Sequence, residues 1–181
     1  MRTVTLVDER NTPIGSADLL EAHTGEGKLH RAFSVYVFSD DGESLLIQQR
    51  AREKMLFAMF WANTCCSHPF ENEDAQTAGA RRLQEELGFS CALTEAGTFV
   101  YRAEDPEGKG VEHEHVTLLV GKIPQSTSIS PNAEEVAEWK WVDVPMLITD
   151  MKENKDAYAP WFHLGLRQLL TTPLPTILSE R

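Results

Sequence analysis

Short apolar and β-branched runs alternate with turn sequences along this chain, a pattern that predicts a fold rich in strands. The predicted strands cover residues 3–7, 32–38, 44–49, 61–66, 98–102, 111–120 and 136–142. The turn sequences Asn11-Thr12-Pro13 and Ser39-Asp40-Asp41-Gly42-Glu43 each predict a hairpin, the first of them at the edge of a sheet. Helical patterns cover residues 73–87, 144–151 and 160–170, and Pro160 suits the first turn of the last helix.

The helix predicted for residues 73–87 has a clear beginning and end. Asn72 is the expected N-cap and Gly88 the expected stop. Residues at steps of four form its buried stripe, namely Ala75, Gly79, Leu83 and Leu87. Charges of opposite sign lie four residues apart on its flanks, in the pairs Arg81–Glu85 and Arg82–Glu86. As surface ion pairs they would contribute only ~0.3–0.5 kcal/mol each.

The strand that leads into this helix carries two adjacent cysteines. If its alternation persists, Thr64, Cys66 and His68 share one face while Cys65 turns away. Cys65 is then suited to the hydrophobic core, and Cys66 is suited to a functional site. Residues 65–89 allow two interpretations: a catalytic, metal-holding turn that feeds a helix, or a buried cysteine pair before a charged surface helix.

Two loops hold further candidate residues, each with two interpretations. A loop with two glycines joins His23 to His30 and can bring both imidazoles to one point, although solvated histidines are equally compatible with the pattern. Arg50, Arg52 and Lys54 follow the strand 44–49 and form a positive patch. This patch is either a solvated loop or a clamp for an anion.

The strand predicted for residues 111–120 has acidic residues at the head of an apolar face. Glu112 and Glu114 lie on the same face, and buried carboxylates need a cation or hydrogen-bond donors to offset lost hydration. His113 and His115 lie on the opposite face, where they could hold a metal as a His-x-His pair or face solvent. Periodicity does not choose between these two faces.

The composition indicates one globular domain over residues 1–181, because 181 residues of which 41% are hydrophobic suffice for a proper core. No apolar run approaches the roughly 18 residues of a membrane span, and the N-terminus MRTVTLVDER reaches an acid by its eighth residue, so we expect a cytoplasmic protein. A net charge of −11 disfavours nonspecific binding to nucleic acid or anionic membrane but permits a small anionic partner at a basic cluster. Three cysteines, two of them adjacent, favour free thiols.

Residues 67–89 can be laid on the Nudix box, G-x5-E-x7-R-E-U-x-E-E-x-G-U, where U is a bulky apolar residue. The matching residues are Glu73, Arg81, Leu83, Glu85, Glu86, Gly88 and Phe89. Ser67 stands in place of the first glycine, and Arg82 replaces the glutamate after the arginine. Nudix hydrolases use that glutamate to gather divalent metal around a diphosphate, so its replacement argues against hydrolysis.

Over nearly its whole length the chain resembles the type 1 isopentenyl-diphosphate delta-isomerases. This branch of the Nudix superfamily departs from the Nudix box in a similar way. The resemblance is carried by AHT around His23, LHRAFSVYVF from Leu29, LLIQQR ending at Arg50, NTCCSHP from Asn63, RRLQEELG from Arg81, YRAEDPEG from Tyr101, VEHEH from Val111 and PWF from Pro160. It implies an α/β fold, the Nudix-type α/β/α sandwich with a mixed sheet. It also implies reversible conversion of isopentenyl to dimethylallyl diphosphate in isoprenoid biosynthesis, through a tertiary carbocation-like state.

By motif position, the resemblance implies two metal sites. A protein-bound Mn²⁺ or Zn²⁺ falls on His23, His30, His68, Glu112 and Glu114. Five ligands exceed the four of a structural zinc and suit a five- or six-coordinate ion. A Mg²⁺ that accompanies the diphosphate falls on Glu86 and the backbone of Cys66. The resemblance therefore favours the glutamate face of residues 111–120, and not the histidine face, as the one that binds metal.

The resemblance also implies how a small diphosphate substrate is held. Arg50, Lys54 and Arg82 match diphosphate contacts, whereas Leu19 stands where the family often carries a lysine. Two other functions compete with the isomerase: a Nudix hydrolase of a nucleoside diphosphate derivative, and a non-catalytic, metal-dependent binding module that kept the fold.

Isomerisation of an alkene needs one acid and one base, and the resemblance assigns these roles to Cys66 and Glu114. A metal-bound carboxylate is ordinarily a poor acid, so Glu114 would need a dry, hydrogen-bonded site, and Tyr101 could supply the hydrogen bond. Trp161 would face the cationic intermediate, although core packing is the default role of any tryptophan.

Overall fold

The structure, a computed structural model, describes residues 2–171. Its strands are β1 (Thr3–Val7), β2 (Pro13–Asp18), β3 (His30–Ser39), β4 (Ser44–Arg50), β5 (Trp61–Ala62), β6 (Cys65–Ser67), β7 (Thr94–Glu104), β8 (Val111–Ile123) and β9 (Val136–Asp143). Its helices are α1 (Leu19–Ala22), α2 (Ala75–Leu87), α3 (Val144–Glu153), the short 3-10 helix η1 (Lys155–Ala157) and α4 (Pro160–Thr171). No helix within residues 2–171 is long and apolar enough to cross a membrane.

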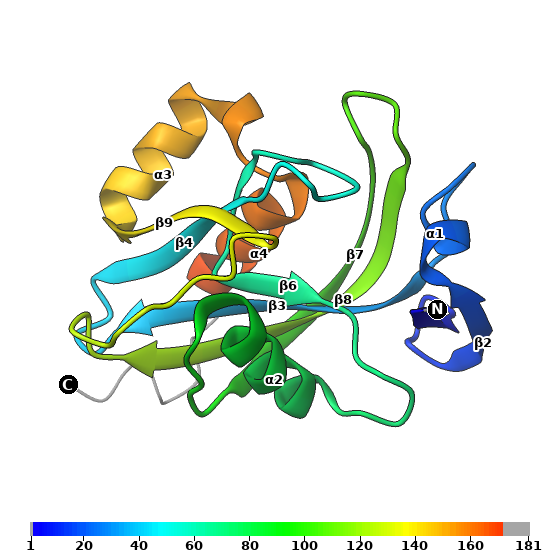
Figure 1. The fold of residues 1–181 in the computed structure, drawn as a ribbon, viewed down its shortest axis with the longest axis horizontal. Coiled ribbons are helices and arrows are strands. Elements are labelled where there is room, and N and C mark those ends of the chain that lie inside the picture. The colour runs from blue at the N-terminus through cyan, green and yellow to red at the C-terminus, as the bar shows by residue number, and fades with distance from the viewer. Residues whose placement is uncertain (1, 172–181) are drawn as a thin grey trace.

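Strand β3 organises the sheet because it pairs with four other strands (Figure 1). It runs parallel to β8, from His30 opposite Glu114 to Ser39 opposite Ile123. It runs antiparallel to β1, β4 and β6, so the sheet is mixed. The two predicted hairpins are confirmed as β1–β2 and β3–β4, and β2 lies at the edge beyond β1.

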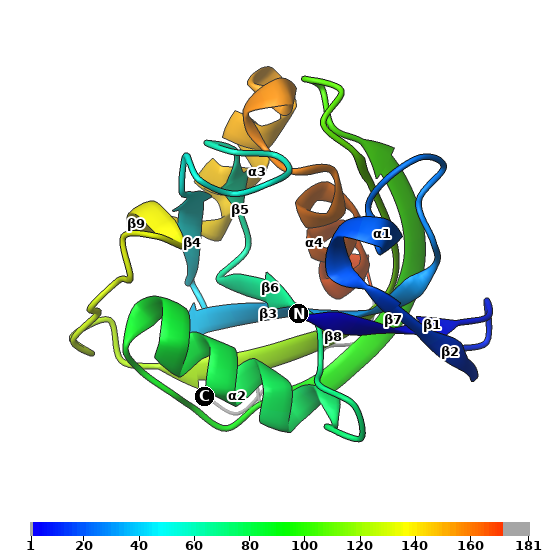
Figure 2. The same ribbon diagram turned by 45° about the vertical axis from the view of Figure 1, so that its right-hand side comes forward.

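Helices cover both faces of this sheet (Figures 1 and 2). On one face, Phe33, Val35 and Val37 of β3 enter a core with α2. On the other, Tyr36 and Phe38 enter a core with α3 and α4. Alternate residues of a strand point to opposite faces, so a strand between two helical layers must be apolar on both. The predicted α/β/α sandwich with a mixed sheet is therefore confirmed.

Strand β8 keeps the alternation that the sequence predicts. Val116 and Leu118 belong to the core with α3 and α4, whereas Leu119 belongs to the core with α2. Glu112 and Glu114 extend the Val116 face beyond the apolar core and line a cavity there. The glutamate face is thus the inward one at this end of the strand.

Helix α2 begins later than predicted and ends where predicted. Its N-cap is Asp74, whose side chain accepts a hydrogen bond from the Thr77 amide at 2.8 Å. The predicted cap, Asn72, is wrong because its left-handed backbone (φ 63°) turns the chain before the helix, which leaves Glu73 outside it. Gly88, with φ 74°, ends the helix as expected.

The strand predicted for residues 61–66 is instead divided into β5 and β6. Strand β5 pairs with β4 and β6 pairs with β3, because β3 and β4 themselves separate after two residue pairs. The Thr64 hydroxyl fills this gap, accepting from the Val37 amide at 2.8 Å and donating to the Leu46 carbonyl at 2.6 Å. Thr64 is therefore buried within the sheet and does not line the cavity that Cys66 and His68 line, because the predicted continuous strand is divided at this point.

Candidate active site

Three imidazoles from separate elements meet at one point. His23 ends α1, His30 begins β3, and His68 follows β6. Their ring centroids lie 4.7 Å (His23–His30), 4.9 Å (His30–His68) and 5.5 Å (His23–His68) apart. Glu114 of β8 joins them, and one potential ligand atom from each of the four residues lies within 4.8 Å of the others. This spacing is close to that of donor atoms that share one ion.

Main-chain carbonyls orient two of these imidazoles. Nδ1 of His23 donates to the Leu19 carbonyl at 2.7 Å, and Nδ1 of His30 donates to the Lys28 carbonyl at 2.7 Å. The Leu19 carbonyl belongs to α1, a four-residue helix that lies just before the predicted glycine loop and that the sequence pattern did not predict. Such hydrogen bonds fix the tautomer and leave Nε2 free to bind a metal.

Close backbone packing holds the His23 loop against β8. The Val111 amide donates to the His23 carbonyl at 2.9 Å. A Cβ atom at Gly110 would lie 2.4 Å from the same carbonyl oxygen, so this approach requires glycine. The contact ties the first imidazole to the strand that carries the glutamates.

Two members of the cluster, His68 and Glu114, have protonation states that suit metal binding; at His23, burial is outweighed by the hydrogen bond with Glu112, which raises the pKa of the imidazole. Nε2 of His23 lies 3.0 Å from Glu112 Oε2, and Nε2 of His68 lies 2.9 Å from Glu114 Oε1. Burial lowers the pKa of His68 to about 3, despite the nearby Glu114 carboxylate. Burial also raises the pKa of Glu114, but hydrogen bonds with His30 and His68 outweigh it and hold this pKa well below its usual range. A neutral imidazole and an ionised carboxylate are the forms that bind metal, so this donor set fits a divalent cation.

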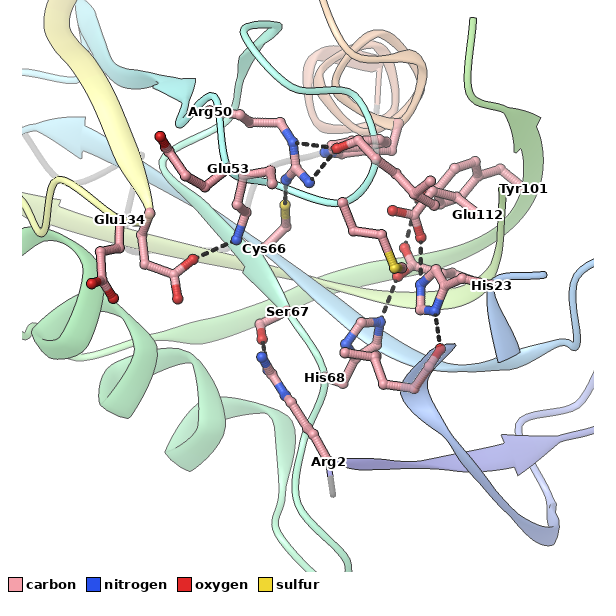
Figure 3. Close-up of a pocket in the computed structure, with 17 residues that line it drawn as sticks. Arg2, His23, Arg50, Glu53, Cys66, Ser67, His68, Tyr101, Glu112 and Glu134 are labelled. Carbon is pink, nitrogen blue, oxygen red and sulfur yellow. Dashed lines mark hydrogen bonds and ion pairs between the residues drawn. The ribbon is translucent and has the colours of Figure 1, made fainter. Parts of the chain in front are cut away.

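A cavity of about 440 Å³ adjoins the cluster (Figure 3). The predicted site residues that line it are His23, Arg50, Lys54, Cys66, His68, Tyr101, Glu112, Glu114 and Trp161. His30, Arg82 and Glu86 are buried behind its wall. Sequence reasoning missed four charged residues of the wall, Arg2, Glu53, Glu134 and Glu135. Glu53 adjoins Lys54 in the predicted basic loop, whereas no local motif marks Arg2, Glu134 and Glu135, which lie far from the other wall residues in the sequence.

The adjacent cysteines point to opposite sides of β6, as the alternation predicts. Cys65 is fully buried in the core with α2. Cys66 lines the cavity, and its Sγ lies 3.8 Å from Nη1 of Arg50. Burial raises the pKa of the Cys66 thiol to about 12, although the charge of Arg50 opposes this. The side chain that faces the cavity is therefore a protonated thiol at neutral pH.

Main-chain carbonyls, not a carboxylate, anchor Arg50. Its Nη2 donates to the Leu56 carbonyl at 2.8 Å and its Nε to the Phe57 carbonyl at 3.1 Å. Phe57 has φ 51°, an unfavourable value for a bulky residue. Its amide donates to the buried Asp105 carboxylate at 2.7 Å, which stabilises this turn. Asp105 thereby supports the carbonyls that aim Arg50 into the cavity.

Aromatic side chains form the wall between Arg50 and the metal cluster. The Tyr101 hydroxyl donates to Glu114 Oε2 at 2.8 Å. Burial and the Glu114 charge raise the pKa of Tyr101 well above its usual value, so the phenol keeps its proton. The Trp161 ring lies 6.0 Å from Tyr101 and 5.2 Å from the Arg50 guanidinium, and its Nε1 donates to Asn63 at 3.1 Å. Trp161 is thus both packed in the core and a wall of the cavity.

A buried charge network lies between α2 and the segment before β9. Arg82 donates to Glu86 Oε1 at 2.5 Å and to Glu135 Oε1 at 2.9 Å. Glu86 also accepts from Gln48 at 2.9 Å, and Lys54 forms an ion pair with Glu135. Arg82 and Glu86 are 6% and 2% exposed, so the interpretation as a surface ion pair does not apply to this pair. The buried face of α2 is wider than its apolar stripe because these charges neutralise one another.

Comparisons with known proteins agree with this architecture. The NUDIX domain model matches residues 28–162. The chain is 44% identical over 158 residues to an isopentenyl-diphosphate Delta-isomerase of Nocardia farcinica, a match that covers 87% of this chain and 89% of that protein. A Burkholderia multivorans protein of the same name is 44% identical over 158 residues, with 87% of each chain covered.

A solved structure from Deinococcus radiodurans has the same fold, with a TM-score of 0.72 and 16% identity over 92% of this chain and 98% of that one. At this identity the likeness concerns the fold alone. The domain match and the 44% identical relatives place the sequence more closely: the chain belongs to the Nudix superfamily and, within it, to the isopentenyl-diphosphate delta-isomerase family.

Proposed function

We propose that this chain catalyses the reversible isomerisation of isopentenyl diphosphate to dimethylallyl diphosphate. The observation that carries this proposal is the placement of Cys66 and the Tyr101–Glu114 pair on one cavity, beside a cluster of metal-binding side chains. Moving a double bond requires one group that adds a proton to the alkene and another that removes a different proton. Two groups capable of proton transfer on one small cavity meet this requirement.

Glu114 and Cys66 would exchange protons with different carbon atoms of the substrate. Tyr101 would keep its hydrogen bond to Glu114 and so orient the carboxyl and tune its acidity. The Trp161 ring would face the cationic intermediate, an attraction of roughly 0.5–2 kcal/mol. Enzymes typically lower barriers by ~8 kcal/mol or more, so positioning and proton transfer must supply most of the effect.

Two divalent ions would complete the site. Mn²⁺ or Zn²⁺ would be held by His23, His30, His68, Glu112 and Glu114. Mg²⁺ prefers a carboxylate together with substrate phosphates, and here Glu86 and the main chain at Cys66 would hold it. When bound, these ions would supply positive charge that organises the carboxylates and neutralises the diphosphate.

The diphosphate would lie at the cationic part of the cavity. Arg50 and Lys54 line this part directly, and Arg82 lies behind it in contact with Glu86. Cations in this position would balance the anionic group while the hydrocarbon part of the substrate extends toward Trp161. The partner we propose is therefore a small allylic or homoallylic diphosphate.

We also propose that the protein acts in the cytoplasm and that its described residues form one domain. Cys65, Cys66 and Cys91 are all free, as expected in a reducing compartment. The two large hydrophobic cores share the strands β3 and β8. Neither core could therefore form without the other.

One assay separates the proposed isomerase from its competitors. The purified protein is given isopentenyl diphosphate and Mg²⁺, and the methyl signals of dimethylallyl diphosphate are followed by NMR together with phosphate release. We expect the isomer without phosphate. Phosphate without isomer would indicate a hydrolase, and no turnover of this substrate or of a nucleotide panel would indicate a binding module.

The adjacent thiols provide a matched pair of variants. Cys66→Ala should abolish isomerisation because it removes one of the two proton-transferring groups. Cys65→Ala should keep most of the activity and lower the melting temperature, because it opens a small void in the core with α2. Equal losses of activity in two well-folded variants would contradict the distinction.

A further inference from the structure

Three cationic side chains among residues 2–171 line the cavity, and they differ in how they are held. Arg50 is bound by main-chain carbonyls, and Lys54 forms an ion pair with Glu135. Nη2 of Arg2, by contrast, donates to the Ser67 hydroxyl at 2.5 Å (Figure 3). Within the described residues, no carboxylate lies within ion-pair distance of Arg2. Among the described residues, Arg2 and Arg50 thus both lack a carboxylate partner, and Arg2 also lacks the main-chain carbonyls that hold the Arg50 guanidinium.

The backbone fixes Arg2 beside the cavity. The Leu19 amide donates to the Arg2 carbonyl at 2.8 Å, and Thr3 pairs with Asp18 where β1 meets β2. Leu19 also lines the cavity but has no charge to offer an anion. Arg2 is thus placed by the same short segment that places His23, and it brings positive charge to the cavity wall beside Ser67.

The surroundings of Arg2 favour an anionic ligand. Partial burial and the charges of Arg82 and Arg81 lower the pKa of Arg2, and together they outweigh the opposite effect of Glu135 and Glu86. Arginine stays protonated in proteins regardless, so Arg2 presents a charged guanidinium to the cavity. The residue remains accessible to solvent, so an incoming anion can reach it.

We propose that Arg2 binds the diphosphate group of the substrate, from the part of the cavity wall where its guanidinium meets Ser67. This assignment rests on the proposed function, since it names a further residue of the same binding site. A guanidinium can donate two parallel hydrogen bonds to a phosphate, which a lone ammonium cannot match. Arg2 thereby replaces the charge that Leu19 does not provide.

The test compares Arg2→Gln with Arg10→Gln, an exposed arginine away from the cavity. Binding of inorganic pyrophosphate in the presence of Mg²⁺ is measured by calorimetry, and KM and kcat are measured for isopentenyl diphosphate. We expect Arg2→Gln to weaken pyrophosphate binding and raise KM by about tenfold, the loss typical of one charged hydrogen bond. The kcat value and the melting temperature should stay close to those of the unaltered protein, as should every property of Arg10→Gln.

A second variant tests the position as well as the charge. Adding Leu19→Lys to Arg2→Gln restores a cation to the same stretch of wall and should recover most of the pyrophosphate affinity. Unchanged affinity in Arg2→Gln, or no recovery in the double variant, would overturn the assignment. Pyrophosphate binding needs no turnover, so a protein that binds pyrophosphate through Arg2 but forms no isomer would refute the proposed function and not this inference.

Discussion

The two ends of the cavity are built on different principles. At the metal end, formed by His23, His30, His68, Glu112 and Glu114, backbone carbonyls orient two of the imidazoles and the side chains contact one another directly. At the anion end, formed by Arg2, Arg50, Lys54 and Arg82, two of the cations are paired with carboxylates of the protein. The main chain orients imidazoles at the metal end, whereas at the anion end it holds only Arg50, and protein carboxylates balance Lys54 and Arg82.

This difference follows from what each end would bind. A metal ion needs donor atoms about 2 Å away in a fixed arrangement, so its ligands must be oriented in advance. A diphosphate offers many oxygens and accepts cations from several directions. Buried cations, however, are costly when unpaired, and Glu135 satisfies both Lys54 and Arg82 until an anion arrives. Binding of the diphosphate at the anion end would therefore replace the Glu135 carboxylate with phosphate oxygens as the partner of Lys54 and Arg82.

The largest effect is expected from removing one ligand at the metal end. His68→Ala should lower metal affinity by at least roughly 100-fold and abolish isomerisation, because the remaining ligands cannot move to close the gap. Metal content after dialysis measures the first effect and the NMR assay the second. His113→Ala is the control, since His113 lies on the opposite face of β8 and should leave metal content unchanged. Loss of metal in the control alone would place the site on the other face.

A smaller effect is expected at Arg50, the one cation of the anion end that the main chain holds. Asp105→Ala should lower kcat/KM by about tenfold, because the turn at Phe57 loses the acceptor for its amide and the two carbonyls no longer aim Arg50. Asp105→Asn keeps a side-chain oxygen and should recover most of the activity. A fall in melting temperature with unchanged kcat/KM would show that Arg50 does not depend on this turn.

The smallest effect is expected from removing the charge of Glu135, which balances Lys54 and Arg82. Burial raises the pKa of Glu135, but Lys54 and Arg82 outweigh it and lower the pKa to about 2. A lowered carboxyl pKa stabilises the fold above the ordinary value near 4.5, and this contribution disappears as the pH falls toward 2. Glu135→Gln should therefore lower the melting temperature by roughly 2–4 °C at pH 7.

The same variant tests whether the diphosphate replaces Glu135 as the partner of Lys54 and Arg82. The difference in melting temperature between Glu135→Gln and the unaltered protein should shrink as the pH falls below about 4.5. Pyrophosphate should bind the variant about two- to fivefold more tightly, because Lys54 is no longer paired. A constant difference across the pH range would mean that the Glu135 charge does not stabilise the fold.

The local sequence pattern was sufficient to predict those structural features that depend on neighbouring residues in the chain. Alternation predicted that Cys65 and Cys66 face opposite ways and that Glu112 and Glu114 share one face of β8, whereas the motif resemblance was needed to choose that face as the inward one. The end of α2 at Gly88 was predicted because glycine adopts the left-handed backbone without strain. Pattern was insufficient at the start of α2, where Asn72 and Asp74 are both good caps and the preceding turn decides between them.

The sequence by itself determined most of the strands and helices, the opposite directions of Cys65 and Cys66 and, through motif resemblance, the family and the layers of its fold. Only the tertiary structure decided which charges meet: Arg82 with Glu86 and Glu135, and Arg2 with the cavity wall. Side-chain direction follows from the two-residue period of a strand, which a sequence displays. Pairing between distant charges depends on strand register and on burial, and both arise only when β1, β3 and β4 come together with α2.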